Sequence, residues 1–254
     1  MDIYKVAGMV FGIEACFDGY RELCREYLFK SRDAVPEFII TVSQDDVALE
    51  KELYSYPCDD ETACISRIYR LLCRQALMRG GFFLHCAAIE YKNKAYLFLA
   101  PSGTGKSTHI SLWRKLFGDE VNIINGDKPL IMPGEDGTFY AYGTPWSGKE
   151  GWQRNVGVSM GAVCILKRGE NNSIVPIDSF LAAQYILRQT IVYSDREGLE
   201  VLLSSVNAFL DSGVECYMLK CNMDIEAAAT SFEGMTGIDC SEYVKNYKER
   251  KEIV

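Results

Sequence analysis

The stretch from Ala95 to Phe117 constrains the fold more than any other, because three structural signals follow one another in it. Residues 95–100 form a continuous apolar and aromatic run, which is typical of a strand buried on both faces. Residues 102–107 read Ser-Gly-Thr-Gly-Lys-Ser, and a helical pattern follows at once. The two glycines allow successive backbone N–H groups to point into one concavity, where the new helix adds its positive end. This order predicts a phosphate-binding loop.

The side chains of this loop suit a nucleotide and a metal ion. Lys106 is expected on a solvent-facing loop, with its ammonium on the outer phosphates, and Thr108 caps the helix or faces the phosphates. Ser107 supplies a hydroxyl where a Mg²⁺ between the β- and γ-phosphates needs an oxygen ligand. Ala100 stands where the full pattern has its first glycine, so an ordinary strand-to-helix turn is the alternative. The residues expected to bind nucleotide are Ser102, Gly103, Thr104, Gly105, Lys106, Ser107 and Thr108.

Composition narrows the class of protein. With 48% hydrophobic and 24% charged residues, the 254-residue chain can bury a sizeable core. Its net charge of −8 and the lack of a basic stripe argue against a nucleic-acid partner. The sequence has no long apolar run and no secretion signal at Met1, so we expect no membrane association and a cytoplasmic location. The ten cysteines form no C-x-x-C pair, which predicts reduced core residues.

The whole chain, 1–254, is expected to form one α/β domain. Its first part, 1–58, is expected to pack on a nucleotide-binding core at 59–240, and the charged tail at 241–254 is expected to fray. The polar segment 42–57 predicts a loop or a loosely attached strand. Further strands are expected within 3–16, 38–42, 82–91, 121–125, 130–132, 139–142, 161–167 and 214–220. Further helices are expected at 18–29, 59–79, 179–191, 196–210 and 224–232.

A short connection, Lys92–Lys94, joins the strand at 82–91 to the strand that feeds the loop. Three residues can join only antiparallel neighbours, because parallel strands need a crossover of about a dozen residues or more. The sheet must therefore be mixed. In simple hairpin register His85 lies level with Pro101, at the mouth of the loop.

Two titratable residues are candidates for the chemistry. Asp127 ends the buried strand that follows the loop helix, where phosphate-transferring enzymes hold a metal ion or take a proton from an acceptor hydroxyl. Its alternative role is that of a turn residue before Lys128 and Pro129. His85 is expected beside the phosphates, and its alternative is a hydrogen-bonded core histidine.

The segment from Trp146 to Trp152 is rich in glycine and tryptophan. It is a candidate lid that closes over the nucleotide or the acceptor, with Lys149 and Arg154 supplying positive charge to the transferred group. A structural turn with surface cations is the alternative.

Four motifs together resemble the C-terminal catalytic domain of HPr kinase/phosphorylase, which shares a nucleotide-binding core with ATP-dependent phosphoenolpyruvate carboxykinase. They are LHCAAI with His85, APSGTGKST, NGDKP and GTPWSGKEG, and they span residues 82 to 155. The resemblance implies a mixed sheet with an antiparallel hairpin into the loop, flanked by helices. It also implies ATP, Mg²⁺ and phosphoryl transfer.

The sequence departs from that family in two places. The acidic turn of the family usually carries two adjacent aspartates, whereas Gly126 precedes Asp127 here. The family's regulatory N-terminal domain is not recognisable in residues 1–81, which argues against the chain being the bifunctional regulator.

The function expected from these patterns is that of an ATP-dependent kinase acting on a hydroxyl of a small molecule, a peptide or a protein. Ser107 and Asp127 would hold Mg²⁺, Lys106 would neutralise developing charge, and His85 or Asp127 would assist the acceptor hydroxyl. The alternative is a nucleotide-binding sensor or assembly module without transfer activity. A carboxykinase would need an arginine cluster and a second metal site, which the sequence does not show.

Overall fold

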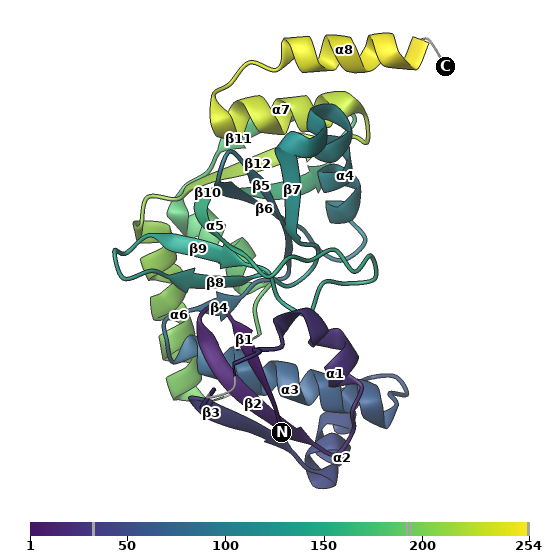
Figure 1. Ribbon diagram of the computed structural model, residues 1–254. Coiled ribbons are helices and arrows are strands. Elements are labelled where there is room, and N and C mark those ends of the chain that lie inside the picture. The colour runs from purple at the N-terminus through teal and green to yellow at the C-terminus, as the bar shows by residue number, and fades with distance from the viewer. Residues whose placement is uncertain (32–33, 192, 194, 253–254) are drawn as a thin grey trace.

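The computed structural model describes residues 1–31, 34–191, 193 and 195–252, and within them it shows an α/β fold with a three-stranded and a nine-stranded mixed sheet (Figure 1). The strands are β1 (Asp2–Val6), β2 (Met9–Ala15), β3 (Phe38–Val42), β4 (Phe82–Phe83), β5 (Cys86–Tyr91), β6 (Lys94–Leu99), β7 (Val121–Asn125), β8 (Leu130–Pro133), β9 (Phe139–Tyr142), β10 (Gly157–Arg168), β11 (Ser173–Pro176) and β12 (Glu215–Cys221). The helices are α1 (Tyr20–Leu23), α2 (Gln44–Glu52), α3 (Asp60–Leu77), α4 (Lys106–Phe117), α5 (Ser179–Leu187), α6 (Arg196–Asp211), α7 (Ile225–Thr236) and α8 (Ser241–Glu252). The predicted fold class, α/β with a mixed sheet, is confirmed.

The large sheet runs in the order β4-β8-β9-β10-β6-β5-β7, with β12 beside β10 and β11 beside β12. The long strand β10 pairs antiparallel with β9 through its first residues and parallel with both β6 and β12 farther on. β6, which feeds the phosphate loop, therefore has β5 on one edge and β10 on the other. This central position explains why its sequence is apolar on both faces.

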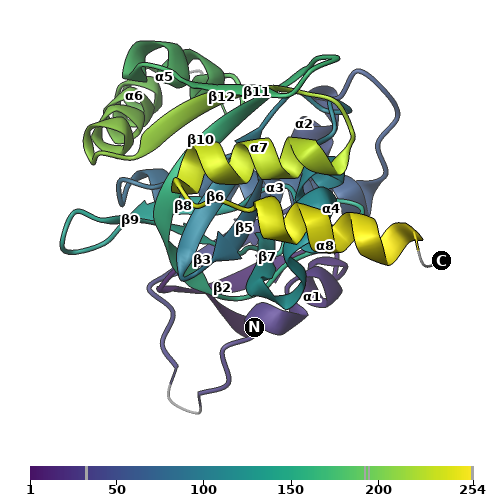
Figure 2. The ribbon, with the colours of Figure 1, turned by 90° about the horizontal axis from the view of Figure 1, so that it is seen from above.

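Two hydrophobic cores lie on the two faces of the large sheet. On one face, Tyr96 and Phe98 of β6 join a core with residues of α4 and α7. On the other, Leu97 and Leu99 join a core with residues of α5 and α6. Figure 2 shows α7 and α8 lying across the sheet and the α5–α6 pair at its side. The helices thus flank a sheet whose loop-bearing end stays accessible.

The small sheet has the order β1-β2-β3, with β1 antiparallel and β3 parallel to β2. It packs against α3, at the lower end of the molecule in Figure 1. Phe83, Leu130 and Met132 from the large sheet enter the same core, so the N-terminal part is joined to the rest by apolar contacts.

The prediction of a loop at 42–57 is wrong, because α2 forms there. Its first turn has a capping box in which Ser43 and Asp46 bond each other's backbone N–H groups. Arg67 and Arg70 of α3 then pair with carboxylates of α2. Val47 is the one buried apolar residue of α2 among those described, so the helix has no apolar stripe. Its capping box and its ion pairs with α3 are the features that favour a helix here.

Other element boundaries differ from the prediction. The charged tail is helical as α8 rather than frayed over 241–252. The helix expected at 18–29 shortens to α1 followed by a turn of 3₁₀ helix. The strand expected at 82–91 divides into β4 and β5, which pair with different strands.

The antiparallel hairpin into the glycine-rich loop that follows β6 is confirmed, but its predicted register is wrong by one residue. Lys92 and Asn93 both have positive φ, 47° and 59°, and form a two-residue turn of the kind that matches strand twist. Lys94 already belongs to β6, so Cys86 pairs with Leu99. His85, just before β5, therefore comes level with Ala100 rather than Pro101.

Across the described ranges, all ten cysteines are free thiols, and most of them are buried. No helix in the same ranges combines the length and the apolar character that crossing a bilayer requires.

Candidate functional site

The loop between β6 and α4 has the backbone that a phosphate-binding loop needs. Gly103 has φ of +75° and Gly105 has φ of +121°, values that residues with a side chain rarely adopt. No side chain of the described residues caps α4 and no acid lies in its first turn, whereas aspartates cap α3, α5 and α6. The N–H groups at this helix end are thus left for an anion.

Lys106 lies at this helix end, and its side chain is drawn inward. The residue is only 8% exposed, so its expected place on a solvent-facing loop is wrong. Its Nζ donates to the carbonyl oxygen of Ala100 at 2.9 Å and lies 3.1 Å from the Nε2 of His85. Burial lowers the pKa of the Lys106 ammonium, which therefore lacks full charge compensation in this environment. A phosphate would supply that compensation.

His85 connects the lysine to Asp127. The His85 Nε2 lies 3.1 Å from the Asp127 Oδ1 as well as 3.1 Å from the Lys106 Nζ. The chain segments are aligned by backbone bonds, since the N–H of Cys86 donates to the Asp127 carbonyl at 3.0 Å and that of His85 to the Gln189 carbonyl at 2.8 Å. One ring nitrogen cannot accept from the lysine and donate to the carboxylate at once, so the imidazole proton selects one partner.

Asp127 carries its charge in a half-buried position. Its Oδ2 accepts from the ammonium of Lys128, which also lies 5.9 Å from the centre of the Tyr69 ring. Burial raises the pKa of Asp127, but the hydrogen bonds from His85 and Lys128 outweigh burial and hold the pKa well below its ordinary value. The carboxylate is therefore ionised at neutral pH.

Asn125 shapes the turn that presents Asp127, and the sequence analysis missed it. Its side-chain oxygen accepts from the N–H groups of Asp127 at 2.9 Å and Lys128 at 2.7 Å, and its amide donates to the Thr144 carbonyl at 2.9 Å. The residue is fully buried. A buried amide at the end of an apolar strand was the available signal, because such a group has to find backbone partners.

Gly126 explains why the turn has a single acid. A Cβ built at this position would lie 2.9 Å from the carbonyl oxygen of Ser147 and 3.5 Å from the Trp152 Cβ. The Gly126 N–H also donates to the Trp152 carbonyl at 2.8 Å. A second aspartate here would displace the 146–152 loop, so this backbone accommodates Asp127 alone.

The loop at 146–152 is fastened to this turn. Besides the Gly126 bond, the Lys128 N–H donates to the Trp146 carbonyl at 3.1 Å. The Trp146 ring packs on Tyr69 at 5.0 Å between centroids. Lys149 is exposed, and among the described residues its ammonium makes no contact with the site. The segment covers Asp127 as a packed turn.

Arg154 is not brought to the site. Its guanidinium forms an ion pair with Glu90 and donates to the Ile123 carbonyl at 3.1 Å. Glu90 lies beside Ala95 at the hairpin end of β5, the end away from the phosphate loop. Five residues of strand separate it from His85, which is roughly 16 Å along the chain.

Arg168 joins the site without a signal in the sequence. It is the last residue of β10, which runs parallel to β6, so the two strands end on the same side. The Arg168 Nη2 donates to the Gly103 carbonyl at 2.5 Å across 65 residues of sequence. Only the pairing of β6 with β10 reveals this contact.

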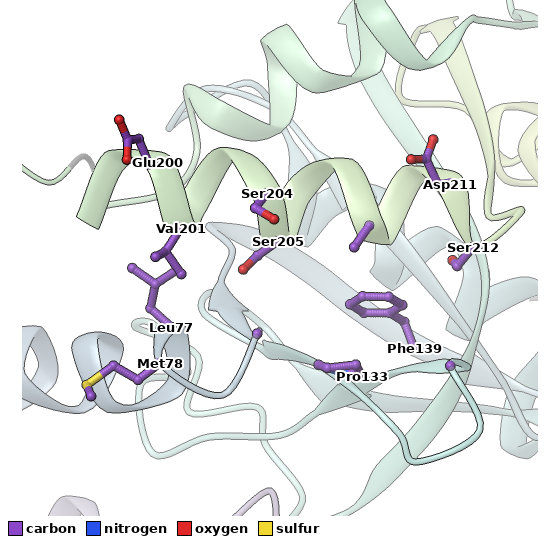
Figure 3. Close-up of a pocket in the computed structure, with 13 residues that line it drawn as sticks. Leu77, Met78, Pro133, Phe139, Glu200, Val201, Ser204, Ser205, Asp211 and Ser212 are labelled. Atoms are coloured by element: carbon purple, nitrogen blue, oxygen red, sulfur yellow. The ribbon is translucent and has the colours of Figure 1, made fainter. Parts of the chain in front are cut away.

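Two cavities bear on ligand binding. One, of about 470 Å³, opens beside the phosphate loop and is bounded by α4 and by the chain after β10 and β12. A larger one, of about 680 Å³, lies between the end of α3, the β8–β9 hairpin and α6 (Figure 3). None of the expected site residues lines the larger cavity, so its size does not mark the chemistry.

No group of three or more His, Cys, Asp or Glu side chains suited to a metal ion occurs among the residues that the structure describes. Mg²⁺ does not require one, because it is usually held by one or two protein oxygens together with substrate phosphates and water. Ser107, in the first turn of α4, and Asp127 offer such oxygens. The donor set therefore fits Mg²⁺ bound with a nucleotide.

The fold is that of an α/β protein with a mixed sheet, and its loop motif, lysine and ionised carboxylate meet at one end of that sheet. The chain belongs to the family described as SynChlorMet cassette protein ScmC, whose model matches residues 56–203, more than half of the 254 residues.

A search of curated proteins gave no match. Among solved structures, the chain is similar to the HPr(Ser) kinase/phosphatase from Coxiella burnetii, at 9% identity, over 49% of this chain and 88% of that one. The TM-score is 0.29, which is too low for a conclusion about fold or function.

Proposed function

We propose that this protein is an ATP-dependent phosphotransferase that moves the γ-phosphate of ATP to a hydroxyl of a small molecule, a peptide or a protein. The observation that carries the proposal is the convergence of three groups at the mouth of one loop. The His85 Nε2 lies 3.1 Å from both the Lys106 ammonium and the Asp127 carboxylate. The motifs that resemble HPr kinase contain all three residues.

The loop would hold the phosphates in a way that places the transferred group at this convergence. The N–H groups of residues 102–108 hold phosphate oxygens, and the lysine reaches the β- and γ-phosphates. Lys106 is buried and its pKa is lowered, so pairing with phosphate relieves an unfavourable burial as well as binding the anion. The lysine then moves from His85 towards the γ-phosphate.

Asp127 and Ser107 would hold Mg²⁺ when a nucleotide is bound. The ion would neutralise charge on the β- and γ-phosphate oxygens. Asp127 is suited to this role because it is already ionised and its position is fixed by Asn125. Lys128, which now pairs with the carboxylate, becomes available to a phosphate oxygen.

His85 would receive the proton of the acceptor hydroxyl. The lowered pKa of Asp127 makes that carboxylate a weak base, whereas an imidazole nitrogen becomes free once Lys106 turns to the phosphate. The neutral ring that acts as the base would carry its proton on Nδ1, and its Nε2 would donate to Asp127 only after it has taken the proton of the acceptor. The acceptor oxygen forms the new bond to phosphorus, ADP leaves with the electrons of the broken bond, and the imidazole carries the proton.

The test is ADP release from Mg·ATP, with and without a panel of hydroxyl-bearing metabolites and a cell extract, followed by mass spectrometry of the phosphorylated product. We expect acceptor-dependent ADP release that Lys106→Ala removes. The proposal is overturned if ATP binds and no acceptor in extract or panel gains a phosphate.

That result would favour the alternative of a nucleotide-binding module without transfer activity. Gly126 is the observation that favours this alternative. The turn holds one acid where the turns of HPr kinase-like enzymes usually hold two, and the backbone around Gly126 leaves no room for a second. In that case Asp127→Asn would lower metal affinity and leave nucleotide affinity unchanged.

A further inference from the structure

The cavity of about 470 Å³ is lined partly by the loop itself and partly by residues at the ends of β10 and β12, which the chemistry described above does not use. We infer that it binds the nucleoside, that is the base and ribose, of the nucleotide whose phosphates the loop holds. The inference rests on the proposed nucleotide binding but not on phosphoryl transfer, since a binding module would use the same cavity.

The direction of the bound nucleotide follows from the two sides of the loop. The Lys106 ammonium, which reaches the β- and γ-phosphates, lies on the side of His85 and Asp127. Gly103, Gly105 and Thr108 line the cavity, whereas His85, Lys106 and Asp127 do not. A phosphate chain that has its outer end at the lysine and follows the loop would therefore reach this cavity at its inner end.

The walls of the cavity suit a flat, largely apolar group. Leu112 of α4, Leu166 of β10 and Met223 after β12 supply apolar surface, and Asn222 adds an amide at the rim. The Asn222 amide is held by bonds to the Glu170 carbonyl and to Asp224, so this rim has a fixed shape. A cavity of this size lies in the range of small-molecule sites, about 300–1,000 Å³.

Charge separates this cavity from the larger one. Lys167 and Arg168 line it, and none of the described residues that line it carries a carboxylate. Glu200 and Asp211 border the larger cavity, with their carboxylates on the side of α6 that faces away from Phe139 (Figure 3). Of the two, only the loop-side cavity has cations among its described lining residues, as an anionic nucleotide would favour.

The first test compares ATP with tripolyphosphate, which has the phosphates and no nucleoside. We expect ATP to bind at least about tenfold more tightly than tripolyphosphate, and Met223→Ala to weaken ATP about fivefold without changing tripolyphosphate affinity. Met223 is 76% exposed, so this variant should fold. The matched control is Met78→Ala, because Met78 is 73% exposed and lines the larger cavity.

The second test uses Cys221, which lines the cavity, and Cys16, which is exposed elsewhere. Alkylation with a small thiol reagent, followed residue by residue by mass spectrometry, should be slowed severalfold at Cys221 by ATP and not by tripolyphosphate. Cys16 should react equally in all samples.

Equal affinity of ATP and tripolyphosphate, or Cys221 unprotected by bound ATP, would overturn the nucleoside cavity while leaving the phosphate loop intact. If neither ligand binds, the proposed function itself fails. The two failures are therefore distinguishable.

Discussion

The two ends of the phosphate loop are built differently. At one end, a series of contacts runs from Lys106 through His85 and Asp127 to Lys128, in a turn fixed by Asn125. At the other, the cavity combines the apolar side chains of Leu112, Leu166 and Met223 with the cations Lys167 and Arg168 and, among its described lining residues, no carboxylate. The first end holds charged groups at fixed positions, which suits a reaction. The second supplies contact area for a ligand, which suits binding. Substitutions at the two ends should therefore separate turnover from affinity.

Lys106→Ala should have the largest effect, because the lysine serves binding and chemistry together. We expect turnover to fall by at least about 10³-fold and ATP affinity to fall with it. Removing a buried ammonium with a lowered pKa should leave the thermal unfolding midpoint unchanged or higher. Calorimetric titration and steady-state kinetics measure the two effects, and unchanged values in a folded variant would refute the site.

Asp127→Asn should divide the two functions of the charged end. Turnover is expected to fall about 10²- to 10³-fold, while ATP affinity without Mg²⁺ stays within about twofold, because the loop N–H groups do not depend on the carboxylate. Full activity in this variant would reduce Asp127 to a turn residue.

The same variant tests the electrostatics by acid unfolding. The folded-state pKa of Asp127 lies below the unfolded value of about 3.9, so the ionised carboxylate stabilises the fold above about pH 4 and that stabilisation is lost as pH falls further. The difference in unfolding free energy between the unmodified protein and Asp127→Asn should shrink below that pH. A constant difference would show that the contacts with His85 and Lys128 carry no stability.

His85→Gln should act on turnover alone. A glutamine amide can still donate to Asp127, but it cannot accept a proton, so kcat should fall about 10²-fold with KM within about twofold. A rise in KM as large as the fall in kcat would instead indicate that His85 positions Lys106.

Arg154→Met should have the smallest effect, because Arg154 is not in contact with the candidate site. The Glu90 ion pair is partly exposed, so we expect less than about 1 kcal/mol lost in unfolding free energy and turnover unchanged within about twofold. A tenfold loss of turnover would support the predicted role of Arg154, which is to supply positive charge to the transferred group.

The sequence predicted what local patterns determine. The apolar run before Gly103 predicted a buried strand, and the short turn at Lys92 predicted an antiparallel neighbour and hence the place of His85. The register failed by one residue because Asn93 tolerates positive φ, which shortens the turn to two residues. Such a choice depends on backbone conformation that composition does not reveal.

Contacts between distant segments could not be predicted in the same way. Arg168 reaches Gly103 only because β10 lies beside β6, and Lys106 is buried only because His85 and Ala100 close over it. The α2 helix was missed because its stability comes from caps and ion pairs rather than an apolar stripe. The first two contacts depend on tertiary structure, whereas α2 begins with a local capping box between Ser43 and Asp46 that hydrophobic periodicity does not reveal.

The position of β6 between two partners has a consequence for how the chain is made. Its neighbour β5 precedes it by a two-residue turn, but β10 begins at Gly157, more than fifty residues after β6 ends at Leu99. A nascent chain therefore carries an apolar strand with one open edge until β10 emerges, and open edges invite pairing with other chains. Chains arrested on the ribosome before residue 157 should be protease-sensitive around β6, and chains arrested past β12 should be protected there.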